Sequence, residues 1–263
     1  MARQGKRVLL VDADPQGDLT TCLGWQNQDN LPATMATLME QAIQEEPVDI
    51  QTALLHHREG VDLLPSNIEL SAMEMALVTA MSREFTLKEV LSQARNRYDY
   101  ILIDCMPSLG RWSPVETVQR RPSRQARQVT INALATADSV IIPVQAHYLP
   151  AKGMTQLLRT IGKVKRQINP NLRVDGVLLT LVDNRTNLAR QTAETLRENY
   201  GSVLHIYHSQ IPLAVKAAET SAAGKSIYAY DPTSKVAMAY ESFTKEVLDG
   251  EKQRVQSKPA LTR

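Results

Sequence analysis

The residues of this chain best suited to chemistry are two aspartates that end an apolar run near its start. Residues 8–11, Val-Leu-Leu-Val, lead into Asp12 and Asp14, and Pro15 and Gly17 follow. In open α/β sheets, ligands bind at the carboxyl ends of the strands. Paired carboxylates at such an end are poor packing choices, but their oxygens are the ligands that hard cations prefer. We therefore predict Mg²⁺–phosphate chemistry at the end of this strand.

A third carboxylate ends a second apolar run. Residues 100–103, Tyr-Ile-Leu-Ile, lead into Asp104, which is the Walker B arrangement, in which a carboxylate holds a Mg²⁺-bound water. This signal is weak alone, because many parallel strands end in an acid. Together with Asp12 and Asp14 it predicts an acidic cluster for a hard cation. The alternative interpretation is three unrelated acids that cap helices or face solvent.

Composition restricts the class of protein. The chain has 263 residues, enough for one large domain or two small ones, and a formal net charge of +2, which argues against a whole-chain polyanion binder. Cys22 and Cys105 have no zinc-binding spacing and are expected to be reduced thiols. No apolar run approaches the roughly 20 residues that span a bilayer, and no signal peptide is recognisable. These features predict a cytoplasmic protein without membrane attachment.

The apolar pattern alternates between strand-like runs and amphipathic helices. Strands are expected at about 7–12, 61–65, 99–104, 138–144 and 173–182, with a weaker one at 203–207, and helices at 34–44, 67–80, 83–97, 151–167, 187–199 and 233–248. This alternation predicts an α/β fold with a doubly wound, mostly parallel sheet flanked by helices.

We expect one α/β domain over residues 1–249 and two segments that break its pattern. Residues 111–128 hold five Arg, one Glu and two Pro, which predicts a basic surface loop or a disordered insert. Residues 250–263 are polar and basic, which predicts a disordered tail. The tail lacks the apolar face of a membrane-surface helix.

Five sequence blocks in order resemble the ParA family of partition ATPases, the deviant-Walker group that includes MinD. The blocks are residues 8–21, 99–110, 130–145, 176–190 and 211–212. The resemblance implies a P-loop NTPase-like fold that uses ATP and Mg²⁺. In it, Asp14 matches the acid that orients the attacking water. Asp12 and Asp104 match the carboxylates that hold the Mg²⁺ hydration shell.

The resemblance also implies residues for the base and for DNA. Asn184 matches an adenine-side contact, and Pro212 and Leu213 match the loop that lines the base. Arg185, Arg190 and Lys216 are the candidates for non-specific DNA binding through phosphate contacts. For each of these three, a solvated helix face is the ordinary interpretation, and only the resemblance favours DNA. The family further implies a homodimer on the nucleoid and a ParB-like partner that stimulates hydrolysis, for a plasmid or a chromosome.

The sequence departs from the family pattern at its start. The family has a strand and a Lys-Gly-Gly-x-Gly-Lys-Thr-type loop before the Asp12 strand, whereas Met1–Gly5 reads as the last turn of the helix after that loop. We therefore expect the first strand and the phosphate-binding loop to be missing, and ATP binding and hydrolysis to be poor. The Gly224-Lys225-Ser226 run does not replace the loop, because Glu219 stands where its first glycine is needed.

Two further departures are smaller. Residues 111–128 intervene where the family runs almost directly from Gly110 into the Thr130 helix, and Met106 stands where a second proline is usual. The insert is either a basic arm that reinforces DNA binding or a tolerated insertion. Because the loop is absent, whether this chain is an enzyme stays open. One alternative is a non-catalytic remnant that binds DNA or a partner, and another is a phospho-accepting receiver domain, which needs only about half as many residues.

Overall fold

A computed structural model describes residues 1–106, 128–146, 151–183 and 185–257. The chain divides into two compact units. The first comprises residues 1–139, 150–173 and 221–224, and the second comprises 140–149, 174–220 and 225–263. Nearly all of the basic insert, residues 111–127, lies outside the described residues, and only Gln128 is described, as the first residue of a helix.

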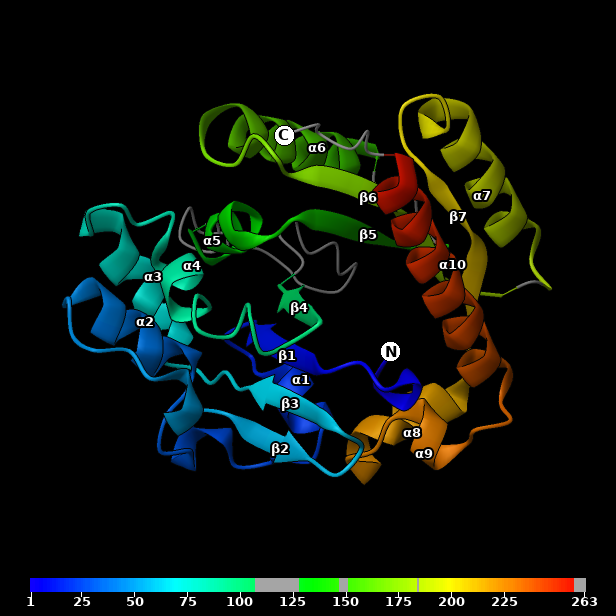
Figure 1. Cartoon of the computed structure of the whole chain (residues 1–263). Coiled ribbons are helices and arrows are strands. Elements are labelled where there is room, and N and C mark those ends of the chain that lie inside the picture. The colour runs from blue at the N-terminus through cyan, green and yellow to red at the C-terminus, as the bar shows by residue number, and fades with distance from the viewer. Residues whose placement is uncertain (107–127, 147–150, 184, 258–263) are drawn as a thin grey trace, which may run out of the picture. The chain divides into compact units, whose positions relative to one another are not determined.

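The first unit is built on a four-stranded sheet in the order β2-β3-β1-β4 (Figure 1). Strand β1 (Val8–Ala13) runs parallel to β3 (Val61–Leu64) and β4 (Tyr100–Cys105), while the short β2 (Leu55–His57) is antiparallel to β3. Leu9 and Val11 of β1 have no solvent exposure. The continuous apolar run therefore forms a central parallel strand that is covered on both faces.

Helices of this unit supply much of its buried core. They are α1 (Asp18–Cys22), α2 (Met35–Ile43), α3 (Leu70–Thr79), α4 (Thr86–Val90), α5 (Gln128–Thr136) and α6 (Ala151–Gln167). Short 3₁₀ turns occupy Ala2–Gln4, Gln28–Asn30 and Ile50–Thr52. Leu38, Leu70 and Leu87, on three different helices, are fully buried in one cluster with Leu9. The sequence predicts a longer helix at 83–97, but residues 91–97 form turns closed by i to i−3 hydrogen bonds.

The two edges of this sheet differ in character. Strand β2 is short and carries His56 and His57, which is an ordinary protected edge. Strand β4 is apolar at its first four positions, yet all its residues are partly or fully exposed, and Leu102 is 44% exposed. Its composition predicts a central strand, but among the described residues no strand pairs with its outer side.

The second unit contains a three-stranded sheet in the order β5-β6-β7, formed by β5 (Ser139–Gln145), β6 (Arg173–Val182) and β7 (Ile206–Pro212). Strands β6 and β7 are parallel. Helices α7 (Asn187–Tyr200), α8 (Val215–Ala223), α9 (Ile227–Tyr230) and α10 (Lys235–Ser257) complete the unit. Helix α10 lies along β7 (Figure 1), where the Tyr207 and Phe243 rings meet edge to face at 4.9 Å.

The predicted α/β class, with mostly parallel strands flanked by helices, is confirmed. The weak strand predicted at 203–207 lies later, at 206–212. Helix α10 continues past Gly250 to Ser257, into the segment for which the sequence predicts disorder. Arg254 explains this extension, because its guanidinium pairs with the buried Asp175 carboxylate of β6. Among the described helices, none is long and apolar enough to cross a membrane.

Candidate functional site: an acidic cluster at the carboxyl ends of β1 and β4

The pairing register of β1 and β4 brings the predicted acids together. Asp12 is the direct register partner of Asp104, and both stand near the carboxyl ends of their strands. Neighbouring strands lie about 4.8 Å apart, so the two side chains start from adjacent positions on one face. Asp14 follows two residues after Asp12, and its backbone N–H donates to Asp12 Oδ1 at 3.2 Å. The three acids that the sequence singles out therefore converge at one edge of the sheet.

Asp12 is fully buried and held by Thr20. Its Oδ2 accepts from the Thr20 backbone N–H at 2.8 Å and from Thr20 Oγ1 at 2.7 Å. Burial raises the pKa of Asp12, the bonds from Thr20 and from the Asp14 N–H oppose this rise, and the Asp14 charge adds to it. The fold thus keeps a desolvated carboxylate in a fixed orientation at considerable electrostatic cost.

A tight turn returns the chain so that Thr20 can reach Asp12. Asp14 Oδ1 accepts from the Gln16 N–H at 2.9 Å, and the Gly17 N–H donates to the Asp14 carbonyl at 2.9 Å. Gly17 has φ +65°, and a Cβ there would stand 2.5 Å from the Gln28 side chain. The left-handed backbone at this position therefore favours glycine, and a larger residue would also have to displace the Gln28 side chain.

Asp104 is crowded by like charges. The residue is exposed to solvent at the sheet edge, but protein atoms surround its carboxyl group. This desolvation, followed by the charges of Asp12, Asp14 and Asp18, raises the pKa of Asp104 to about 6. Both causes disfavour the ionised form of Asp104.

The donor set fits a hydrated Mg²⁺. Two adjacent carboxylates with uncompensated negative charge are oxygen ligands, and Mg²⁺ commonly keeps several waters while it binds one or two carboxylates. Within the described part of the chain, no three His, Cys, Asp or Glu residues are close enough to form a complete protein ligand set. The pairing of Asp12 with Asp104 suits an Mg²⁺ that keeps several of its waters.

Sequence reasoning missed the residues that support Asp12. Thr20 has no solvent exposure, and its Oγ1 also accepts the Ser66 backbone N–H at 3.1 Å. One hydroxyl therefore links the end of β1 to the chain just after β3. The sequence carries a signal in the Thr20-Thr21 pair within the first block, but nothing in it distinguishes the buried threonine from its half-buried neighbour.

Two of the residues predicted to contact the base, Pro212 and Leu213, are described, and both lie beside the end of β6 in the second unit. Val182 is the register partner of Pro212, and the Leu213 N–H donates to the Val182 carbonyl at 3.0 Å. Leu213 is 50% exposed and therefore accessible. Asn184 lies outside the described residues. Leu181, just before Val182, has φ +51°, a left-handed conformation that a leucine adopts only under strain.

The three predicted DNA-binding residues lie on the surface of the second unit, and two of them are paired. Arg185 donates to Asp183 through Nε and Nη2 at 2.9 Å each, and Lys216 Nζ lies 2.6 Å from Asp231 Oδ2. Each carboxylate raises the pKa of its basic partner and neutralises part of its charge. Arg190 is exposed, and no described residue forms an ion pair with it.

The Gly224-Lys225-Ser226 run has a structural role. Gly224 follows the end of α8 with φ +58°, and the Ser226 side chain caps α9 by accepting the Ala229 N–H at 3.3 Å. The run therefore connects two helices, in agreement with the sequence argument against a phosphate-binding loop at this position.

Comparison with known proteins places the chain in a family. The family model described as AAA domain matches residues 1–116 and 121–174. The sporulation initiation inhibitor protein Soj of Bacillus subtilis is 39% identical over 247 residues, which are 94% of this chain and 88% of Soj. The chromosome partitioning protein ParA of Caulobacter vibrioides is 34% identical over 256 residues, which are 97% of this chain and 87% of that protein.

A solved structure is also similar to this chain in fold and sequence. The cobyrinic acid a,c-diamide synthase from Mycobacterium smegmatis, with bound ADP and magnesium, has a TM-score of 0.76 and 33% identity, covering 95% of this chain and 85% of its own. The α/β fold, the AAA domain match and these similarities define the class of protein. The chain belongs to the ParA/MinD family.

Proposed function

We propose that this protein is a ParA-type ATPase that acts in the partitioning of a plasmid or chromosome. The observation that carries the proposal is the register of β1 and β4, which sets Asp12 beside Asp104 with Asp14 next to them. The similarity to Soj and to ParA over nearly the whole chain supports the same assignment.

The acids would divide the work of hydrolysis. Asp12 and Asp104 would hold the hydration shell of Mg²⁺, which supplies charge neutralisation of the phosphates when bound. Asp14, which is only half-buried, would orient the water that attacks the terminal phosphate. Thr20 keeps the Asp12 carboxylate in its orientation through two hydrogen bonds. Pro212, Leu213 and Asn184 would line the base.

We further propose that the ATP-bound form is a homodimer that binds DNA without sequence preference and is stimulated by a ParB-like partner. Arg185, Arg190 and Lys216 are exposed and basic, as phosphate contacts require. Because Asp183 and Asp231 neutralise two of these side chains, Arg190 is expected to contribute most. Binding through phosphates should weaken steeply as salt rises.

The catalytic capacity of this polypeptide depends on how its phosphates are held. No stretch of the 263 residues has the glycine-rich loop pattern that ends in Gly-Lys-Thr or Gly-Lys-Ser. Each charge-assisted bond to phosphate contributes about 1.5–3 kcal/mol, and micromolar affinity corresponds to about 8 kcal/mol. We therefore propose that the chain as given binds ATP weakly and hydrolyses it slowly.

The test combines a turnover assay with sedimentation. Mg²⁺-dependent ATP hydrolysis is measured for the unaltered protein, for Asp14→Asn and for the matched control Asp18→Asn, which removes a nearby exposed carboxylate. The proposal expects a slow rate that falls at least about 100-fold in Asp14→Asn and stays within about twofold in Asp18→Asn. ATP should also increase the dimer fraction and the retention on DNA. Equal rates in the two variants would refute the role of Asp14.

The second candidate function is a non-catalytic protein that binds DNA or a partner. The observation that favours it is Arg190, which is exposed and has no ion-pair partner among the described residues, so that it could contact DNA without any nucleotide. In that case the sedimentation behaviour and the DNA affinity would not depend on ATP or Mg²⁺, and no hydrolysis would be detected. Arg190→Ala would still weaken DNA binding.

A further inference from the structure

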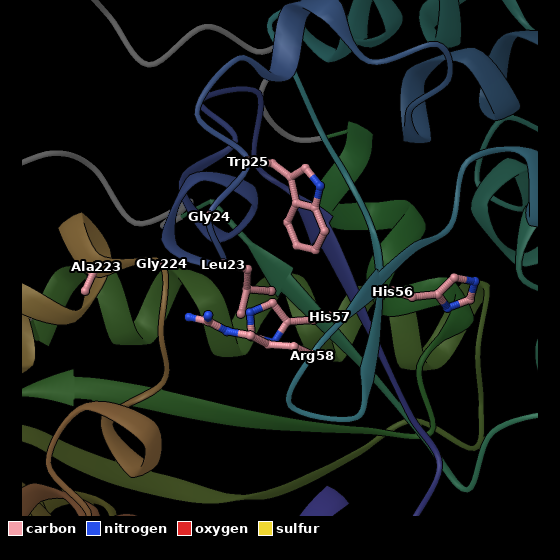
Figure 2. A pocket seen from close by; sticks show the side chains of 8 residues that line it. All are labelled: Leu23, Gly24, Trp25, His56, His57, Arg58, Ala223 and Gly224. Atoms are coloured by element: carbon pink, nitrogen blue, oxygen red, sulfur yellow. The ribbon is translucent and has the colours of Figure 1, made fainter.

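A small open hollow lies in the first unit. It has a volume of about 340 Å³ and is lined by the chain after α1, by the β2–β3 hairpin and by the end of α8 (Figure 2). Its walls include Leu23, Trp25, His57 and Arg58. Neither Asp12, Asp14 nor Asp104 lines it, and the proposed ATPase function assigns it no role.

Two aromatic rings form one corner of the hollow. The centroids of the Trp25 and His57 rings are 5.9 Å apart, with their planes at 60°. His57 Nδ1 accepts the Glu59 backbone N–H at 3.3 Å, which fixes the ring and leaves Nε2 available to a ligand. Among the described residues, the Trp25 indole N–H has no hydrogen-bond acceptor. The corner therefore offers two aromatic surfaces and two ring nitrogens for polar contacts.

Arg58 supplies the charge. Its side chain is exposed, and no described residue forms a hydrogen bond or an ion pair with its guanidinium. Arg7 and Arg83 of this unit, by contrast, pair with Asp99 and Glu84 at 3.1 and 3.2 Å. His56, the neighbouring residue, points away from the other side chains in Figure 2, and its Nδ1 lies 2.6 Å from Asp62 Oδ1. Arg58 is therefore an uncompensated cation beside the aromatic corner.

Two glycines, Gly24 and Gly224, form another part of the lining. Gly24 has φ +105° and Gly224 has φ +58°, and a Cβ on Gly224 would lie 2.8 Å from the Gly24 Cα. A side chain on Gly224 would force the two chain segments apart, so their close approach requires glycine at that position. The 3.1 Å contact between Cys22 Sγ and Ser221 Oγ holds the same segments together. This close approach gives the hollow a defined shape.

We propose that this hollow is a binding site for a small planar ring that carries a phosphate or carboxylate. The ring would pack against Trp25 and His57, and the anion would accept hydrogen bonds from the Arg58 guanidinium. Arginine binds such anions through two parallel N–H donors, and aromatic rings prefer offset or edge-to-face contact. A volume of about 340 Å³ is near the lower limit for ligand pockets and holds one ring with one anionic group.

The probes separate the two parts of the ligand. Phenyl phosphate carries both the ring and the anion, inorganic phosphate carries only the anion, phenol carries only the ring, and benzoate replaces the phosphate by a carboxylate. The readout is the fluorescence of Trp25. Trp112, the other tryptophan of the chain, is replaced by Phe in every protein, and excitation at the red edge of tryptophan absorption avoids the probes. ATP and Mg²⁺ are left out.

The site predicts saturable quenching by phenyl phosphate and by benzoate, each at least about tenfold tighter than inorganic phosphate or phenol. In Arg58→Ala the affinity for phenyl phosphate should fall at least about tenfold, which corresponds to about 1.4 kcal/mol. Arg58→Lys keeps the charge but loses the paired donors, so its affinity for phenyl phosphate should lie between those of the unaltered protein and Arg58→Ala. Arg159→Ala, which removes an exposed arginine of α6 in the same unit, should bind as the unaltered protein does.

Two results would overturn the proposal. One is equal quenching by phenyl phosphate and inorganic phosphate, which would show that the ring is not recognised. The other is unchanged affinity in Arg58→Ala when its circular dichroism and melting temperature match those of the unaltered protein. Asp14→Asn should bind phenyl phosphate as the unaltered protein does, so this experiment tests the hollow independently of the proposed ATPase function.

Discussion

Replacing Thr20 by Val should destabilise the first unit far more than an ordinary threonine substitution. Valine keeps the shape of the side chain but removes the hydroxyl that donates to Asp12 Oδ2 at 2.7 Å and accepts the Ser66 N–H at 3.1 Å. The lost bond to a charged group costs about 1.5–3 kcal/mol, and the buried N–H left without a partner costs about 1–3 kcal/mol. We therefore expect a loss of about 3–5 kcal/mol.

The measurement is thermal and urea unfolding with two comparison variants. A loss of this size lowers the melting temperature by about 6–20 °C for a unit of this length. Thr20→Ser keeps the hydroxyl and should lose no more than about 1 kcal/mol. Thr21→Val removes a hydroxyl that bonds the neutral Gln28 amide at 2.9 Å at a half-buried position, and should also cost about 1 kcal/mol. If Thr20→Val is no less stable than Thr21→Val, the Asp12–Thr20–Ser66 connection does not hold the site.

Two further predictions concern carboxylates that hold backbone N–H groups. Glu74 is 3% exposed and accepts the Gln128 and Val129 N–H groups of α5, so Glu74→Ala should cost about 2–4 kcal/mol in urea unfolding, whereas the exposed Glu69→Ala should be nearly neutral. For Glu246, burial acts to raise the pKa, but hydrogen bonds from the His208 and Ser209 N–H groups lower it overall. Its carboxylate therefore stabilises the fold above the unfolded pKa of about 4.3, and this contribution is lost as pH falls through the lower folded value. Glu246→Gln should lower the free energy of unfolding by about 1–2 kcal/mol at neutral pH and make that free energy less dependent on pH in acid. An unchanged pH dependence of stability in this variant would contradict the stabilising role of the Glu246 carboxylate.

The parts of the fold that the sequence predicts best are those with a continuous apolar pattern. The strands at residues 8–13 and 173–182 lie almost where the pattern puts them, because burial on both faces leaves little choice of residue. The pattern is weaker near residues 91–97, where mostly polar residues give no period, and the expected helix boundary is less accurate there. At residues 203–205 the apolar Val203 and Leu204 precede the strand without belonging to it. The short β2 strand was not predicted, since three residues with two histidines give no strand signal.

The sequence likewise predicts only part of the candidate site. The sequence identifies Asp12, Asp14 and Asp104, because charged residues directly after apolar runs are conspicuous in a single chain. It gives no sign of the Thr20 hydroxyl that supports Asp12, or of the Arg58 hollow, because each is made by segments distant in sequence. It also gives no reason to expect that Asp183 and Asp231 neutralise two of the predicted DNA-binding side chains.

By itself, the order of residues determined the α/β class, the family resemblance and the acids at the ends of two strands, since each of these is written in local runs and spacings. Only the tertiary structure decided that Asp12 and Asp104 are paired in register, that Glu74 caps a helix more than fifty residues away, and that Trp25, His57 and Arg58 share one hollow. The physical reason is that strand register and helix packing follow from the burial of the whole core. No short window of sequence contains that information.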